Sequence, residues 1–315
     1  MNAMNRDFQQ IEWDAATIED CRQLVRLAVR EDLERQQDWT TLALVAADRV
    51  GAADIVSRQA GFVAGMQAVA VTIDEMGGQL TFEPLVADGD QIAAMTTLGR
   101  LSGNVRDLLT CERIILNILG RMMGVATLAG QYVERVAGTS ARIYDTRKTT
   151  PGWRRLEKFA VRCGGARNHR LGLYDAVLIK DNHLAQFAQP GEAAGATAAR
   201  AVRQAREFLR QFAAVDSLPS GGIVEIEVDS LDQLAAVLPE HPEIVLLDNM
   251  SLEQLRQGVE MRNSTAPDVE LEASGGVNLD TVRDIAETGV DRISVGGITH
   301  AARSLDVGLD WQMGV

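Results

Sequence analysis

The second half of the chain repeats one pattern six times: a short apolar run ends in a polar or glycine-rich tip, and a helix-like segment follows. The apolar runs are residues 141–145, 176–179, 223–228, 244–247, 269–273 and 292–295. Two of the following segments open with capping-box patterns, Ser230-x-x-Gln233 and Ser251-x-x-Gln254. Repeated strand–helix units predict parallel strands with crossover helices. Because no Gly-x-Gly-x-x-Gly fingerprint accompanies them, the six units favour an α/β barrel over a doubly wound sheet.

The first half of the chain has a different character. Residues 13–35 carry the apolar stripe of a helix. Between residues 50 and 105, β-favouring runs alternate with turn signals and predict an antiparallel sheet. These runs are 55–57, 69–73 and 80–82. Residues 106–136 return to a helical period, in which Gly120 or Gly124 is a candidate break.

Composition excludes several classes of function. A net charge of −13 argues against general nucleic-acid binding through a basic surface. The three cysteines, Cys21, Cys111 and Cys163, are far apart and form no Cys-x-x-Cys pair, which suits reduced thiols in the cytoplasm. No run of about 18 apolar residues exists, so we expect no membrane span, and the N-terminus has no signal-peptide pattern.

Basic residues are concentrated between residues 142 and 180. This stretch holds ten Lys or Arg against three Asp or Glu, a local balance of +7 in an acidic protein. The only lysines of the chain, Lys148, Lys158 and Lys180, all lie within it. Most charge runs are solvated helix faces. A concentrated positive field in an acidic protein also attracts anions, and the confinement of lysine to this stretch favours an anion-binding function.

The strand tips hold residues suited to a small anionic ligand. Carboxyl ends of barrel strands meet at one side of the barrel, so we expect the tips to converge. The tips and the adjoining basic stretch contain Arg147, Lys148, Arg170, Lys180, Glu227, Asp248, Gly275, Gly276, Gly296 and Gly297. Arginine matches carboxylates, lysine suits phosphate, and glycine-rich tips bind phosphate through backbone N–H groups. The acids are suited to sugar hydroxyls or to Mg²⁺ on a pyrophosphate.

Two reactions fit these residues. One is transfer of a phosphorylated sugar, in which cations hold the departing pyrophosphate and acids stabilise a cationic sugar centre. The other is Schiff-base chemistry with Lys180 as the nucleophile. A sensor that binds a phosphorylated ligand without turnover is a third reading. The residues themselves leave these alternatives open.

The chain contains an ordered set of motifs. In chain order they are Cys111-Glu112-Arg113, Asp145-Thr146-Arg147-Lys148-Thr149-Thr150, Asn168-His169-Arg170, Leu178-Ile179-Lys180-Asp181-Asn182-His183, Glu225-x-Glu227, Leu247-Asp248-Asn249, Glu272-Ala273-Ser274-Gly275-Gly276 and Ser294-Val295-Gly296. This set resembles the quinolinate phosphoribosyltransferase family, also called carboxylating nicotinate-nucleotide pyrophosphorylases. The resemblance covers about residues 105–310 and, more weakly, residues 19–104. It implies an open, TIM-like α/β barrel of the type II phosphoribosyltransferases over residues 129–300. An N-terminal α/β sandwich domain is implied over residues 1–128, joined by the segment 301–315.

The resemblance also implies an activity. The expected enzyme transfers the phosphoribosyl group of phosphoribosyl pyrophosphate to quinolinate with decarboxylation. The products are nicotinate mononucleotide, CO₂ and pyrophosphate, in NAD biosynthesis, and the cofactor is Mg²⁺. The nearest alternatives are a related phosphoribosyltransferase with another acceptor and a Schiff-base lyase using Lys180.

Roles follow for residues that match the family's motifs. Quinolinate is expected among Arg147, His169, Arg170 and Lys180. The phosphates are expected beside Lys148, Ser274, Gly275, Gly296 and His300. Glu227 and Asp248 are expected at the ribose hydroxyls or the metal, and with Lys148 and Lys180 they form the expected catalytic group. Arg113 is expected to come from the partner subunit of a homodimer or higher homo-oligomer.

The sequence departs from the family's pattern in two segments. Near the N-terminus the family usually shows Asp-Leu-Gly-x-Gly-Asp-x-Thr-Thr. Here residues 32–41 lack both glycines and contain one more residue, so a loop of different shape is expected. Residues 184–222 form a longer connection than usual, and its arginine-rich part predicts an extended outer helix or an assembly contact. Neither segment includes a matched site residue.

Overall fold

The computed structural model describes residues 7–77, 79–212 and 222–312. The chain forms two compact units that are interleaved in sequence. We call the first the barrel unit; it comprises Met1–Gln10, Tyr132–Arg147 and Arg167–Gly296. We call the second the sandwich unit; it comprises Ile11–Gln131, Lys148–Ala166 and Gly297–Val315. The expected division into 1–128 with 301–315 and 129–300 stays a prediction.

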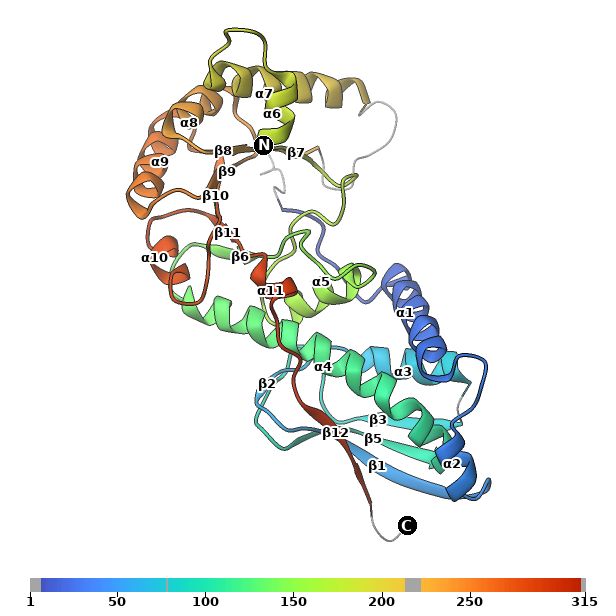
Figure 1. The fold of residues 1–315 in the computed structure, drawn as a ribbon. Helices are drawn as coiled ribbons and strands as arrows, with labels where there is room; N and C mark the ends of the chain where they lie inside the picture. The colour runs from blue at the N-terminus through green and yellow to red at the C-terminus, as the bar shows by residue number, and fades with distance from the viewer. Residues whose placement is uncertain (1–6, 78, 213–221, 313–315) are drawn as a thin grey trace. The chain divides into compact units, whose positions relative to one another are not determined.

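The barrel unit is built on a curved sheet of six parallel strands (Figure 1). They are β6 (Arg142–Tyr144), β7 (Val177–Ile179), β8 (Val224–Val228), β9 (Ile244–Asp248), β10 (Glu270–Ser274) and β11 (Arg292–Ser294). Their order is β7-β8-β9-β10-β11-β6, and among the described residues no pairing joins β6 to β7. All six predicted strands are confirmed, and so is the α/β class with an open barrel.

Helices lie outside this curved sheet (Figure 1). They are α6 (Asp181–Phe187), α7 (Ala194–Phe212), α8 (Leu231–Val237), α9 (Leu252–Thr265) and α10 (Val282–Ala286), with a 3₁₀ turn at Leu238–Glu240. Both predicted N-caps are present: the Ser230 hydroxyl accepts the amide hydrogen of Gln233, and Ser251 forms a complete capping box with Gln254.

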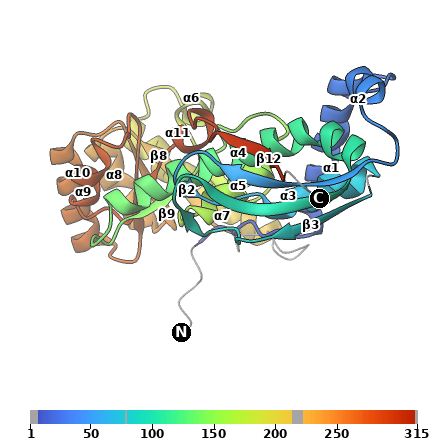
Figure 2. The ribbon, with the colours of Figure 1, turned by 90° about the horizontal axis from the view of Figure 1, so that it is seen from below.

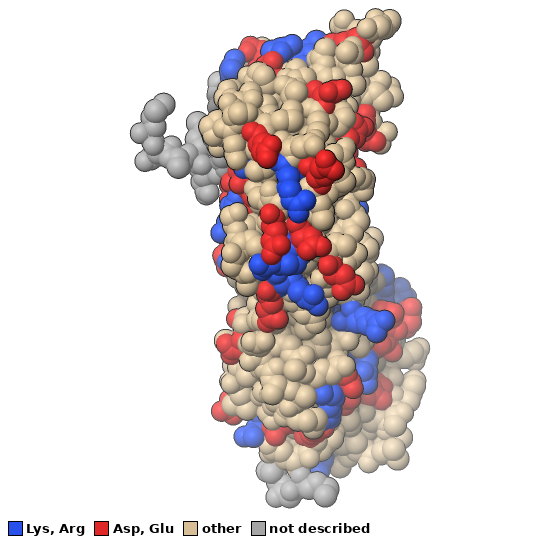
Figure 3. Space-filling model, turned by 90° about the vertical axis from the view of Figure 1, so that its left-hand side faces the viewer, with Lys and Arg blue, Asp and Glu red and all other residues tan. Residues whose placement is uncertain are grey.

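The long connection at 184–222 is filled largely by α6 and α7. Four α7 arginines pair with Glu192, Glu240, Glu243 and Glu207; they are Arg200, Arg203, Arg206 and Arg210. The predicted outer helix is therefore confirmed, while residues 213–221 lie outside the described part of the chain. On the face drawn in Figure 3, acidic and basic side chains are interleaved and no large field of one sign forms.

The sandwich unit contains an antiparallel sheet in the order β12-β1-β5-β3. Its strands are β1 (Val50–Ser57), β3 (Leu80–Pro84), β5 (Thr96–Asn104) and β12 (Val307–Trp311), and a separate pair is formed by β2 (Gly61–Phe62) and β4 (Gln91–Ile92). The helices are α1 (Ala15–Leu33), α2 (Trp39–Leu44), α3 (Met66–Met76), α4 (Val105–Arg135), α5 (Arg154–Cys163) and α11 (Gly297–His300). Helices α3 and α4 cover one face of the sheet (Figures 1 and 2).

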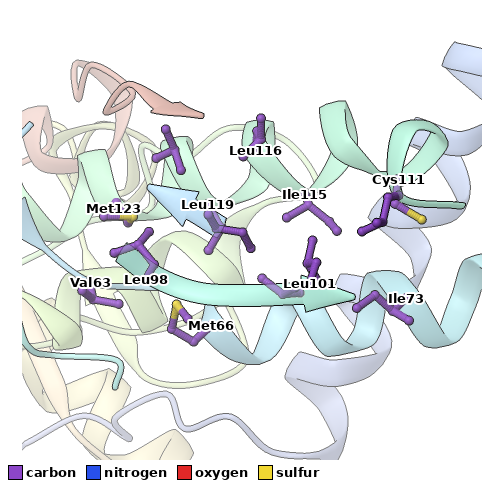
Figure 4. Close-up of a cluster of buried hydrophobic side chains, with 14 of the residues drawn as sticks. Val63, Met66, Ile73, Leu98, Leu101, Cys111, Ile115, Leu116, Leu119 and Met123 are labelled. Atoms are coloured by element: carbon purple, nitrogen blue, oxygen red, sulfur yellow. The ribbon is translucent and has the colours of Figure 1, made fainter. Parts of the chain in front are cut away.

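The core of the sandwich unit lies between these two helices and the sheet (Figure 4). Met66 and Ile73 from α3 meet Leu98 and Leu101 from β5 and Leu119 from α4. Helix α4 is long and apolar enough to cross a membrane by composition alone. However, 72% of its most apolar 18-residue window is buried inside the protein, as expected for a core helix.

Two local predictions were wrong. Residues 69–73 belong to helix α3, because Val69 and Ile73 are four residues apart and share the buried face of a helix. Helix α4 is not broken at its glycines. A Cβ on Gly120 would lie 2.7 Å from the carbonyl oxygen of Leu305, and one on Gly124 would lie 2.1 Å from that of Arg303. These glycines therefore allow a close approach of the chain and do not end the helix.

The altered loop at 32–41 connects α1 to α2. Glu34, which stands where the family's first glycine is expected, has a φ of 50°, a conformation that favours glycine. Asp38 caps α2: its Oδ1 accepts the amide hydrogen of Thr41 at 3.0 Å, and its contacts to Thr41 hold the pKa of the Asp38 carboxyl below its usual value. The Asp-x-Thr-Thr end of the loop therefore forms the N-cap of α2, and the altered part of the loop lies before it, at residues 34–37.

Candidate active site in the barrel unit

Polar side chains follow β7 and β9 and alternate along β8. Glu225 and Glu227 are two residues apart on β8, so they share one face of the sheet. Register places Ile179 of β7 beside Ile226, which sets Lys180 next to Glu227. The Lys180 ammonium forms an ion pair with the Glu227 carboxylate, whose side chain is 13% exposed. The sheet therefore brings one predicted base and one predicted acid into direct contact at neighbouring strand ends.

The tips of β9 and β10 are joined by a tight backbone contact. Asp248 ends β9, and the amide of Asn249 donates to the Ser274 carbonyl at 2.9 Å. The Asn249 side chain donates to Asp248 Oδ2 at 2.7 Å. Gly275 has a φ of 94°, and a Cβ there would lie 2.1 Å from Asn249 Oδ1. Only glycine fits this position, so Gly275 maintains the tip that presents Asp248.

Two arginines of the barrel unit lack full compensation by acids. Arg170 is 5% exposed and donates from Nη1 to the Ala176 carbonyl at 3.2 Å. Burial lowers the pKa of the Arg170 guanidinium, and the charge of Arg147 lowers it further against the opposing effect of Glu225. The Nε of Arg147 is buried and has no hydrogen-bond partner among the described residues. Two guanidinium groups that destabilise each other form a site that an anion would stabilise.

The loop that carries Arg170 is anchored by buried acids. Asp145, which follows β6, accepts hydrogen bonds from the Asn168 side chain and the His169 amide, both at 2.8 Å. Asp175 accepts the amide hydrogen of Leu171 at 2.8 Å. Residues 168–171 are therefore fixed on both sides of Arg170, so the backbone that carries its guanidinium is held before any ligand binds.

His169 lies inside the barrel with two acids that received no role from the sequence. Its Nε2 is 3.1 Å from Glu225 Oε2 and 3.5 Å from Glu272 Oε1, and both acids are fully buried. Burial lowers the pKa of His169, but the two carboxylates outweigh it and the result is a pKa of about 9. Burial alone would raise the pKa of Glu272; His169 and Arg292 oppose it, so the net direction is down.

The structure offers two sets of side chains for a metal ion. The ligand atoms of His169, Glu225 and Glu272 lie within 4.8 Å of one another, and the imidazole, which carries at most one positive charge, faces both carboxylates. Glu227 and Asp248 supply carboxylate oxygens at neighbouring tips, the donor type that Mg²⁺ prefers when it also binds phosphates and water.

The predicted site residues divide between the two units. The barrel unit contains Arg147, His169, Arg170, Lys180, Glu227, Asp248, Ser274, Gly275 and Gly296. The sandwich unit contains the other three, all exposed: Arg113 on α4, Lys148, and His300 on α11. Within that unit the Thr299 hydroxyl donates to the Lys148 carbonyl at 2.7 Å.

The basic stretch at 142–180 is not one positive surface. Its middle part, Lys148–Ala166, belongs to the sandwich unit, and the flanking parts belong to the barrel unit. Several of its arginines are neutralised by acids within their own unit: Arg142 by Glu270, Arg155 by Asp20, Arg162 by Glu12 and Arg167 by Asp7. The function of the stretch is therefore confined to a few cations near the strand tips.

Comparisons with known proteins show the family to which this chain belongs. The family model described as quinolinate phosphoribosyl transferase, C-terminal domain, matches residues 125–310, and the corresponding N-terminal domain matches residues 38–123. A carboxylating nicotinate-nucleotide pyrophosphorylase of Mycobacterium leprae is 44% identical over 301 residues, covering 95% of this chain and 98% of the relative. A probable enzyme of the same name from Synechocystis is 38% identical, covering 84% of this chain and 83% of the relative.

Solved structures give the same result. The nicotinate-nucleotide pyrophosphorylase of Francisella tularensis superposes with a TM-score of 0.84 at 33% identity, covering 97% of this chain and 100% of the other. NadC from Streptococcus pyogenes superposes with a TM-score of 0.82 at 32% identity, covering 96% and 99%. With both domains matched and the motifs in order, the chain belongs to the quinolinate phosphoribosyltransferase family.

Proposed function

We propose that this protein transfers the phosphoribosyl group of phosphoribosyl pyrophosphate to quinolinate and removes one carboxylate, giving nicotinate mononucleotide, CO₂ and pyrophosphate for NAD biosynthesis. The observation that carries the proposal is the pair of guanidinium groups in the barrel unit. Arg170 is held rigidly, and the buried Nε of Arg147 has no partner among the described residues. Quinolinate has two carboxylates and is suited to such a pair.

The reaction needs little covalent chemistry from the protein. The ring nitrogen of quinolinate attacks the anomeric carbon of the sugar, and pyrophosphate departs with the bonding electrons. The resulting pyridinium stabilises negative charge at the adjacent ring carbon. The bond from that carbon to its carboxylate then breaks, CO₂ leaves, and a proton takes its place. Catalysis therefore depends on positioning and on charge stabilisation by the strand-tip residues.

The other predicted site residues are assigned to phosphoribosyl pyrophosphate. We propose that Glu227 and Asp248 approach the ribose hydroxyls and the Mg²⁺ that accompanies pyrophosphate. In this scheme Lys180 exchanges its ion pair with Glu227 for a contact to substrate when the site fills. The phosphates are assigned to Lys148, Ser274, Gly275, Gly296 and His300. This assignment rests on the family's motifs and on the chemistry of the side chains.

The structure argues against two of the three alternatives that the sequence left open, the lyase and the sensor. A Schiff-base lyase requires a neutral amine at Lys180, whereas the ammonium here is paired with a carboxylate. A sensor that binds a ligand without turnover does not require two acids at neighbouring strand tips, so Glu227 and Asp248 favour an enzyme. A phosphoribosyltransferase that uses another acceptor would have the same site geometry. The acceptor must therefore be identified by assay.

Assembly and location are also proposals. We propose a homodimer or higher homo-oligomer in which Arg113, exposed on α4, enters the partner's site. We propose the cytoplasm as its location because the three cysteines are free thiols, far apart in the sequence and without a Cys-x-x-Cys pair.

The proposed function is tested with purified protein, Mg²⁺ and phosphoribosyl pyrophosphate against a panel of pyridine carboxylates. Quinolinate should be consumed with release of pyrophosphate, and nicotinate and picolinate should react far more slowly. Omission of Mg²⁺ should abolish pyrophosphate release. A folded protein that consumes no quinolinate under these conditions would refute the proposal, and trapping of a substrate adduct with borohydride would favour the lyase.

A further inference from the structure

Two short segments of the sandwich unit carry residues that are assigned to phosphates. We call residues 148–150 the lysine segment, because it contains Lys148, and residues 297–302 the histidine segment, because it contains His300. The lysine segment lies outside any helix or strand, and the helix α11 of the histidine segment is only four residues long. Lys148 and His300 are both exposed. Their positions therefore depend on what holds the backbone beneath them.

One arginine of helix α4 holds the backbone on both sides of His300. Arg121 donates from Nη2 to the Thr299 carbonyl at 2.5 Å and from Nη1 to the Ala302 carbonyl at 2.8 Å. These carbonyls lie one residue before His300 and two residues after it. The planar guanidinium presents its donors in a fixed geometry, which a lysine ammonium does not. Arg121 therefore fixes the end of α11 that presents His300.

A glutamate of helix α5 holds the lysine segment. Glu157 Oε2 accepts the amide hydrogen of Thr150 at 3.0 Å, and Glu157 Oε1 accepts the hydroxyl hydrogen of the same residue at 2.8 Å. The two segments are also joined directly, because the Thr299 hydroxyl donates to the Lys148 carbonyl at 2.7 Å. The backbone of Lys148 is thus held at its own carbonyl and again two residues further along the chain.

Arg121 and Glu157 form an ion pair with each other, and helices α5 and α11 both lie beside α4 (Figure 1). Arg121 Nη2 lies 2.6 Å from Glu157 Oε1, and the glutamate side chain is fully buried. A buried carboxylate is unfavourable unless a partner compensates it. The backbone groups that this pair binds belong to the two phosphate segments. The pair therefore links the support beneath Lys148 to the support beneath His300.

We propose that Arg121 and Glu157 are positioning residues for phosphoribosyl pyrophosphate, and that their ion pair fixes Lys148 and His300 relative to each other. The inference rests on the proposed function, which it deepens by naming the residues that hold the phosphate-binding groups in place. Neither residue has to touch the substrate. Recognition by groups on separate segments requires both groups to be in place, and a displacement of about 1 Å in a positioned group lowers rates by about 100-fold.

The first test compares Arg121→Lys with Arg100→Lys as a matched control. Arg100 also pairs with a carboxylate of the sandwich unit, from Nε to Asp54 Oδ1 at 2.9 Å, but that pair joins strands β5 and β1. We expect Arg121→Lys to raise the KM for phosphoribosyl pyrophosphate about 10-fold or more, with the KM for quinolinate unchanged within about twofold. Arg100→Lys should leave both KM values unchanged.

Thr299→Val tests the same link without altering a charge. Thr299 is fully buried, and valine has nearly the same shape but lacks the hydroxyl that donates to the Lys148 carbonyl. We expect this variant to raise the KM for phosphoribosyl pyrophosphate about threefold or more, and again not the KM for quinolinate. Glu157→Gln should act in the same direction, and Thr299→Val takes its place should the buried substitution prevent folding.

A double-mutant cycle separates positioning from direct contact. If Arg121 acts through His300, Arg121→Lys should raise the KM for phosphoribosyl pyrophosphate by less than about threefold in a His300→Asn background. If Arg121 itself binds a phosphate, the two substitutions should have independent effects that multiply.

The outcomes distinguish the inference from the proposed function. No quinolinate turnover by the unmodified protein would remove the proposed function. Turnover by the unmodified protein, together with an unchanged KM for phosphoribosyl pyrophosphate in folded Arg121→Lys and Thr299→Val variants, would overturn the positioning role alone. Equal increases in both KM values, or multiplicative effects of Arg121→Lys and His300→Asn, would overturn it as well.

Discussion

Replacement of Gly275 by alanine should disrupt the tip that presents Asp248. Two costs are expected. The backbone has a φ of 94°, which an alanine adopts at a cost of about 1–2 kcal/mol. The new Cβ would also lie 2.1 Å from Asn249 Oδ1 and 3.0 Å from the Asn249 backbone nitrogen, so Asn249 must move.

Movement of Asn249 would weaken or break two hydrogen bonds. One runs from its backbone amide to the Ser274 carbonyl, and the other from its side chain to Asp248. Each is worth about 0.5–1.5 kcal/mol. Gly276 provides a matched control, since its φ is 63° but a Cβ there would meet no atom within 4 Å. Gly276→Ala should therefore carry the backbone cost alone, and Gly275→Ala should be less stable by a further ~1–3 kcal/mol.

The comparison is made by urea denaturation of both variants, with steady-state kinetics on the folded proteins. Because the displaced Asn249 contacts Asp248, Gly275→Ala should also lose more kcat than Gly276→Ala, by about 10-fold or more. Equal free energies of unfolding and equal kcat values in the two variants would show that the contact between the β9 and β10 tips does not position Asp248.

Three further outcomes follow from the same site. Arg147→Met should raise the free energy of unfolding of the ligand-free protein by about 1 kcal/mol, because it removes a buried unpaired donor, while abolishing quinolinate turnover; a loss of stability in urea would contradict this. Lys180→Met should lower kcat by about 100-fold or more, and since Lys180 is 41% exposed its ion pair should change stability by less than about 1 kcal/mol; retention of kcat would refute its role. The folded-state pKa of His169, about 9, exceeds its unfolded value, so its stabilising effect is complete below about pH 6.5 and is lost as the pH rises through 9. Denaturation at a series of pH values should show this decline and its reduction in His169→Gln; an equal decline in both proteins would mean that other groups cause it.

Much of the barrel could be predicted because its signals are local. Each parallel strand is a short apolar run, and the residue after it sits at the edge where ligands bind. Lys180 and Asp248 were found in this way. The pairing of Lys180 with Glu227 required the strand register, which places Ile179 beside Ile226. That register is a long-range property that no short pattern contains.

The errors also have physical causes. Val69 and Ile73 belong to a β-favouring run, yet they form one buried face of a helix because burial against β5 outweighs intrinsic preference. Gly120 and Gly124 resembled helix breaks, whereas they allow a close approach of residues 303–305, which lie about 180 residues away in sequence.

The buried acids were quoted in the motifs but given no role. A signal did exist, since Glu225 and Glu272 are charged residues inside otherwise apolar runs, and such residues are rarely buried without a partner. The identity of that partner, His169, could not be predicted. The loop that carries it is held by side chains distant in sequence, among them Asp145, and no short pattern contains those contacts.

The central claim is that the barrel unit binds a dicarboxylate beside a phosphorylated sugar and couples transfer to decarboxylation. The most direct measurement is the release of CO₂ and pyrophosphate from quinolinate labelled at its 2-carboxylate, with nicotinate as the comparison. We expect one CO₂ for each pyrophosphate with quinolinate, and almost no pyrophosphate with nicotinate, which cannot engage both Arg147 and Arg170. Equal pyrophosphate release from the two acids, or pyrophosphate release without CO₂, would contradict the account.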